Sequence, residues 1–198
     1  MSTKLSFFAE VVESSPQSWK SQCWQWDQPP VFGSLAVVDC QKNLSYGVVH
    51  HIYTGSDDPS RSVFAYQKTL EELQREQPQV FMFLKTVFTA LTVGYTQDQH
   101  ICYTYAPLAA SLHAFVRPAT AEEYQLFFRR PGYLPILFGQ AHQLGNLDEL
   151  LLAMIRVARQ HGGFDESGLQ QFIETFSLLG NNDYRRLKMF LQRVEQIV

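Results

Sequence analysis

The feature that most constrains the fold is a change in the spacing of apolar residues near Pro118. Before this proline, short apolar and β-branched runs alternate with polar turns, which is the pattern of consecutive strands. After it, apolar residues recur every three or four positions, as in amphipathic helices. We therefore predict an α+β fold. A small six- to seven-stranded β-barrel covers residues 1–118, and a region of three to four helices covers residues 119–198 and packs on the barrel.

The first half is expected to hold six or seven strands and one short helix. Alternation places Val37 and Val49 in the interior, with Lys42 and Asn43 in the turn between their strands. The helix is expected over residues 69–76, before Pro78. The predicted strands cover residues 5–13, 19–26, 34–40, 44–54, 80–96, 100–106 and 112–116.

The second half begins with a capping box, Thr120 with Glu123, which predicts a helix running to about Arg129. Residues 132–140 are expected to be extended, because Pro135 restricts the residue before it. Three more helices follow, the first ended by Gly162-Gly163 and the last capped by Asn182. Their apolar faces are Leu147, Leu150, Leu151, Met154, Ile155 and Ala158; Leu169, Phe172, Ile173 and Phe176; and Tyr184, Leu187, Phe190, Leu191 and Val194.

Composition excludes several classes of protein. A net charge of −3 and a pI near 6.1 are unlike the basic footprint of nucleic-acid-binding domains. Three scattered cysteines without a CxxC pair indicate reduced thiols. The apolar stretch 80–95 contains Lys85 and is too short to cross a bilayer, and the N-terminus lacks the apolar core of a signal peptide. We expect a cytoplasmic chain without a membrane span.

The sequence lacks the usual patterns of catalysis and metal binding. His50 and His51 are adjacent in a predicted strand and should point to opposite faces, so they cannot share one metal ion. No histidine pair has the HxxxH spacing of a zinc site, and Ser167 is not in a G-x-S-x-G elbow. No glycine precedes a lysine, so there is no P-loop. We predict no catalytic residue, no cofactor and no metal: the chain is not expected to be an enzyme.

Two pairs of residues are the candidates for a partner surface. Alternation places Trp24 and Trp26 on one face of a predicted strand, and Trp19 with Cys23 on the other. A tryptophan pair is either core or a patch for a protein partner or a stacked base. Arg129 and Arg130 end a predicted helix, where they either face solvent or contact phosphate or an acidic partner.

Four short motifs resemble the HAS barrel, the small N-terminal β-barrel shared by HerA-type DNA-translocating ATPases and rotary ATP synthase subunits. They are "AEVVES", residues 33–38, residues 46–49 and residues 118–124, and the resemblance covers about residues 5–130. Ala9 and Glu10 stand where the family often has glycine, and no motor domain follows. The resemblance implies a non-enzymatic interaction or assembly module with a protein partner. Because the contacts of a motor domain are missing, we expect a monomer or homodimer rather than a hexameric ring. The alternative is an accessory factor in DNA processing that associates with nucleic acid.

Overall fold

The computed structural model describes residues 6–40, 43–58, 63–98 and 100–197, with the side chain of residue 197 excepted. Seven strands form one antiparallel sheet in the order β2-β1-β7-β3-β4-β5-β6, and a pairing between β2 and β5 closes six of them into a barrel. β6 extends from the outer end of β5. The strands are β1 (Ala9–Ser14), β2 (Ser18–Cys23), β3 (Leu35–Cys40), β4 (Asn43–Ser56), β5 (Leu84–Gln97), β6 (His100–Cys102) and β7 (Phe115–Pro118).

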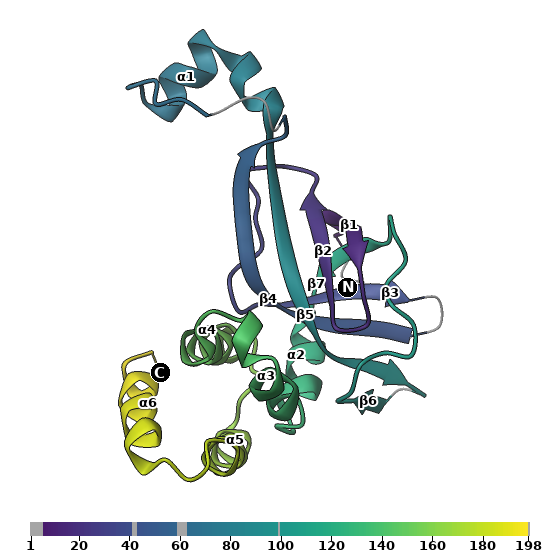
Figure 1. Ribbon diagram of the computed structural model, residues 1–198, viewed down its shortest axis with the longest axis vertical. Coiled ribbons are helices and arrows are strands. Elements are labelled where there is room, and N and C mark those ends of the chain that lie inside the picture. The colour runs from purple at the N-terminus through teal and green to yellow at the C-terminus, as the bar shows by residue number, and fades with distance from the viewer. Residues whose placement is uncertain (1–5, 41–42, 59–62, 99, 198) are drawn as a thin grey trace.

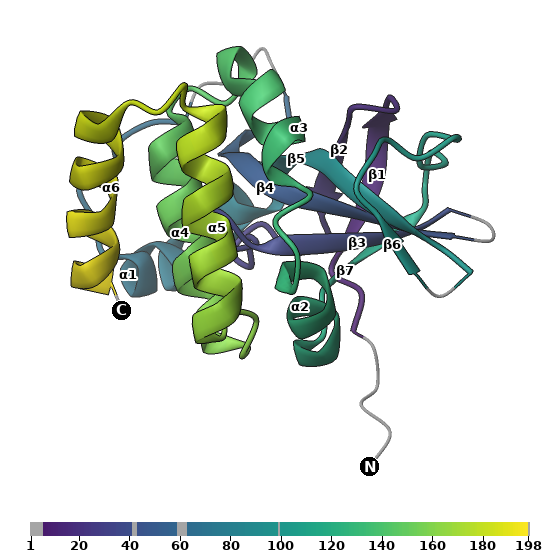
Figure 2. The ribbon, with the colours of Figure 1, turned by 90° about the horizontal axis from the view of Figure 1, so that it is seen from below.

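The helices fall into two groups, as Figure 1 shows. One short helix and a 3₁₀ helix lie between β4 and β5, at the far end of these strands. The rest follow the barrel and gather on one side of it (Figure 2). The elements are α1 (Leu70–Glu76), η1 (Pro78–Phe83), α2 (Ala121–Phe128), α3 (Leu134–Gly139), η2 (Ala141–Gln143), α4 (Leu147–Gln160), α5 (Glu166–Leu179) and α6 (Tyr184–Ile197).

Two hydrophobic clusters explain why β3 is almost continuously apolar. Ala36 and Val38 point into the barrel, where Trp19 fills the space against Gly47. Leu35 and Val37 point outward and are covered by the C-terminal helices. A strand covered on both faces needs apolar residues at consecutive positions. The cluster on the outer face joins the barrel wall to the helices that follow residue 118. Val49 lies inside the barrel, as predicted, whereas Val37 is buried on the outer face of the barrel, beneath the helices.

Several boundaries differ from the predictions. β2 ends at Cys23, so Trp24 and Trp26 lie beyond it, and the start of the predicted strand 80–96 is η1. Cys40 pairs with Asn43, which therefore belongs to β4 rather than to a turn; Lys42 lies outside the described residues. β6 ends at Cys102, and β7 begins only at Phe115.

The prediction of an extended segment over residues 132–140 is wrong. Leu134–Gly139 form α3, with Pro135 in its first turn. The N–H groups of a first turn have no acceptor within the helix, so a proline costs no hydrogen bond there. With α3, the described part of residues 119–198 holds five α-helices instead of three to four.

The capping box of α2 is confirmed: the Thr120 side chain accepts from the Glu123 N–H, and the Glu123 carboxylate accepts from the Thr120 N–H. The cap of α6 is Asp183 instead of Asn182, because the Arg186 N–H donates to Asp183 Oδ1 at 3.0 Å. Tyr184, predicted on the apolar face of α6, is 75% exposed. The outer side of α6 is therefore not purely polar.

Candidate interaction surface

β4 and β5 are each 14 residues long and extend beyond the barrel. Their pairing continues to Ser56 and Leu84, whereas β2 accompanies β5 only as far as Val87. Figure 1 shows the two strands projecting as a ribbon that carries α1 at its end. We call residues 53–58 and 63–85 the arm. A two-stranded ribbon with a short helix is only marginally stable in water without further packing.

The end of the arm has almost no packing of its own. None of residues 63–83 is buried. α1 has seven residues and is held by a capping box in which the Glu72 N–H donates to Thr69 Oγ1 at 3.2 Å and the Thr69 N–H donates to Glu72 Oε2 at 2.9 Å. Isolated helices this short are unstable in water. The large apolar side chains exposed on the arm are Tyr53, Val63, Phe64, Tyr66, Leu70, Met82 and Phe83.

Trp26 fixes the base of the arm to the barrel. Its ring stacks on Phe81 with centroids 5.5 Å apart and an angle of 16° between the planes. Its carbonyl accepts a hydrogen bond from Thr86 Oγ1. Lys85 Nζ lies 3.0 Å from Asp57 Oδ1 across the two strands. Trp26 is thus half-buried and positions the arm.

Trp24 belongs to a different surface. It is 53% exposed, and its ring meets Phe115 edge-on at 5.4 Å, while Phe7 lies 5.5 Å from Phe115. These three side chains, which we call the aromatic patch, lie together because the Trp24 N–H donates to the Phe8 carbonyl and the Phe8 N–H to the Val116 carbonyl. The aromatic patch is an exposed apolar surface on the barrel wall, separate from the arm.

Arg129 and Arg130 follow α2 and are both exposed. Neither makes an ion pair with any residue that the structure describes. The four residues predicted from sequence therefore lie in three places: the aromatic patch, the base of the arm and the end of α2. Sequence reasoning missed Phe7, Phe115 and the arm. The available signal was the apolar residues within a segment otherwise rich in turn-forming and charged residues, 55–79.

The adjacent histidines do not follow a regular strand. A β-bulge lies between Val49 and His51, and it interrupts the alternation on which their predicted opposite orientation rested. His50 is half-buried and His51 is exposed. No group of three His, Cys, Asp or Glu side chains among the described residues is arranged to hold a metal ion.

His50 gives a prediction for pH dependence. Burial, and then the charge of His51, lower the pKa of His50 below its ordinary value of 6.5. The folded state therefore favours neutral His50, and protonation favours the unfolded chain. Stability should be unaffected by His50 above pH 6.5 and fall as the pH drops below it. We expect a proton NMR titration to place His50 below 6.5 and His50→Gln to weaken the pH dependence of unfolding. A midpoint at or above 6.5 would contradict the burial of this ring.

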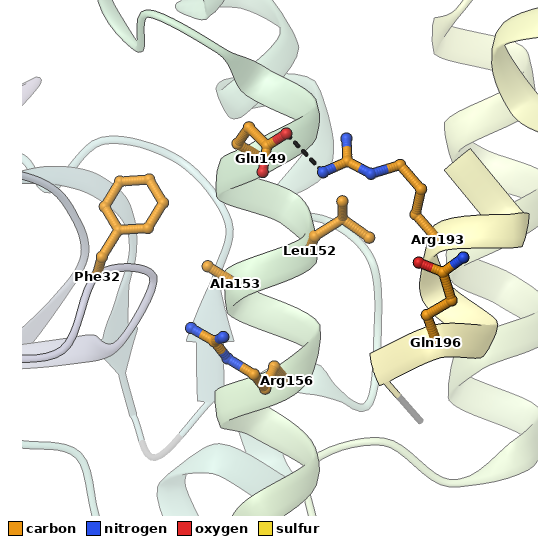
Figure 3. Close-up of a pocket in the computed structure, with 7 residues that line it drawn as sticks. All are labelled: Phe32, Glu149, Leu152, Ala153, Arg156, Arg193 and Gln196. Carbon is orange, nitrogen blue, oxygen red and sulfur yellow. Dashed lines mark hydrogen bonds and ion pairs between the residues drawn. The ribbon is translucent and has the colours of Figure 1, made fainter. Parts of the chain in front are cut away.

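Two hollows flank α6. The first, of about 230 Å³, lies between α4, α6 and the loop carrying Phe32 (Figure 3). Arg193 pairs there with Glu149 at 2.5 Å, and Arg156 lies on the same wall without an ion pair to a described residue. The second, of about 340 Å³, lies along the part of α6 that ends at Arg193. It is lined by Asp148, Asp183, Arg185, Arg186, Met189, Phe190 and Arg193. Both hollows are lined by residues of α4 and α6 and combine charged with apolar side chains.

No protein-family model matches the chain, and none of the curated proteins is a significant match. Among the described residues, no helix has the length and apolar character required to cross a membrane.

Proposed function

We propose that this chain is a non-enzymatic interaction or assembly module whose arm binds a protein partner. The observation that carries the proposal is the end of the arm, residues 63–83, which exposes large apolar side chains and buries none of its residues. Exposed apolar surface costs roughly 25 cal/mol per Å² relative to buried surface. Monomeric soluble proteins rarely expose large contiguous apolar patches, and such patches usually mark interaction sites.

The scaffold suits this role. The arm grows out of two strands that also close the barrel, and Trp26 stacks against its base. A partner would thus meet an apolar surface whose base is fixed to the barrel. The proposal also draws on the resemblance to the HAS barrel of HerA-type ATPases, where the barrel mediates subunit and partner contacts. We also propose that the chain has two domains, the barrel over residues 1–118 and the helical region over residues 119–198. A cytoplasmic location, also proposed, is favoured by three free cysteines.

Affinity capture from the native cell tests the proposal. Tagged wild-type chain should retain a partner in stoichiometric amount, whereas Leu70→Asp with Met82→Asp should lose it. Both positions are on the arm and exposed, so the variant should fold normally. The matched control is Leu112→Asp with Leu126→Asp, two leucines exposed away from the arm. Recovery of the same proteins with the arm variant and the wild type would contradict a binding role for the arm.

A role in association with nucleic acid is the second candidate, and two observations favour it. The aromatic patch exposes Trp24 and Phe115, on which bases can stack, and Arg129 and Arg130 are free to contact phosphate. Under this candidate, labelled single-stranded DNA binds with an affinity that falls as salt rises, and Trp24→Ala weakens it. Absence of binding at low salt removes the candidate without affecting the arm.

A further inference from the structure

The apolar surface of the arm is large enough for a stable interface. Phe64 is 69% exposed and Met82 is 80% exposed. Large apolar side chains at such exposures each present on the order of 100 Å², so the seven on the arm present about 700 Å² in total. A standard protein interface takes about this area from each partner. The arm therefore suffices for one side of a specific interface.

The charge of α1 indicates what lies on the other side. This helix carries three carboxylates and one arginine, a net charge of −2. Glu72 is held by the capping box, and Glu76 is paired with Lys68 and Arg75. Glu71 is exposed and makes no ion pair with a described residue. The helix thus presents Leu70 beside a free negative charge.

The outer side of α6 has the complementary character. Of its charged side chains, Arg186 and Arg193 pair with Asp148 and Glu149 of α4, which leaves two basic residues and one glutamate. Arg185 and Lys188 are exposed and make no ion pair with a described residue. Tyr184 and Met189 are exposed beside them. α6 thus presents apolar side chains beside free positive charge, which matches α1 in both respects.

One molecule cannot bring these helices together. Figure 1 shows α1 at one end of the long axis and α6 at the other. Two molecules placed antiparallel about a two-fold axis bring each α1 against the α6 of the other copy, and both contacts form at once. Two-fold pairing with self-complementary surfaces is the commonest assembly of soluble homo-oligomers.

We propose that the partner of the arm is a second copy of this chain, in an antiparallel dimer in which α1 of each copy lies on α6 of the other. The inference rests on the proposed function, since it names the partner of the same arm. A second copy fits better than an unrelated protein because the chain itself carries both complementary surfaces. If the partner were a different protein, the exposed Arg185 and Lys188 of α6 would have no proposed contact.

Light scattering of the purified full chain over a concentration series tests the dimer. The mass should be about twice 22.8 kDa for the wild type and for the control Leu112→Asp with Leu126→Asp. It should fall toward 22.8 kDa for Leu70→Asp with Met82→Asp, with an unchanged circular dichroism spectrum. A wild-type monomer, or a mass near that of a hexamer, would overturn the inference.

Charge reversal tests the pairing of α1 with α6. Glu71→Lys alone, and Arg185→Glu with Lys188→Glu alone, each place like charges in both contacts, and each should weaken the dimer by about tenfold or more, which is 1.4 kcal/mol. An equimolar mixture of these two variants restores opposite charges in both contacts, so it should recover the dimer mass. If these substitutions leave the stability of the dimer unchanged, the dimer assembles through another surface, and that result overturns the inference.

The two proposals fail in different ways. A monomeric chain that still captures a different protein through Leu70 and Met82 contradicts the dimer and leaves the proposed function standing. A chain that captures neither itself nor another protein through the arm contradicts both.

Discussion

Replacing Glu123 with Ala is expected to lower the free energy of unfolding by about 3–5 kcal/mol, the usual cost of breaking a buried ion pair by removing one partner. Arg117 is only 7% exposed, and its two terminal nitrogens each lie 2.7 Å from an oxygen of Glu123. The same carboxylate accepts from the Thr120 N–H and caps α2. Its removal leaves a buried guanidinium without its paired carboxylate where β7 passes into α2. Urea denaturation followed by circular dichroism measures the loss.

Two further variants identify the cause. Glu13→Ala breaks the exposed pair with Lys20 and should cost no more than about 1 kcal/mol. Arg117→Met combined with Glu123→Leu removes both charges, so it should be more stable than Glu123→Ala alone. A double variant less stable than Glu123→Ala would show that the carboxylate acts through the cap of α2 and not through the buried arginine.

Val49→Asp is expected to cost more than about 4 kcal/mol, or to prevent folding, because it places an unpaired charge inside the barrel. Val49 is fully buried, and the cluster around it consists of apolar residues such as Trp19, Phe88 and Val116. Val12→Asp is the matched control, since Val12 is also a barrel valine but is partly exposed. Equal stability of the two variants in urea would show that β4 does not line the barrel interior at this point.

Much of the fold was predictable because burial leaves a clear periodic signal. Alternation identified Val49 as interior, and the three-to-four spacing identified α4 through Leu150, Leu151 and Ile155. The helix α3 is not predicted from the sequence, because a proline disfavours helical backbone in the residue before it. That restriction is outweighed when the segment begins a helix whose apolar side chains are buried, as Leu134 and Leu137 are.

The candidate site was less predictable, because it depends on contacts between distant segments. Trp24 and Trp26 are two residues apart, yet one joins the aromatic patch and the other stacks on Phe81. Strand alternation could not separate them, since the strand ends before both. The arm was missed for a related reason: its apolar side chains have no regular period, and only the three-dimensional arrangement reveals that none of residues 63–83 is buried.

Hydrogen exchange at the end of the arm tests the central claim most directly. The amides of α1 and η1 should exchange rapidly in the dilute chain, because none of residues 63–83 is buried and local opening costs little there. In the assembled form, at high concentration or in complex purified from the native cell, the same amides should exchange at least about tenfold more slowly. The strands of the barrel should exchange slowly in both. Equal exchange of the arm in the dilute and assembled forms would contradict its role as the binding element.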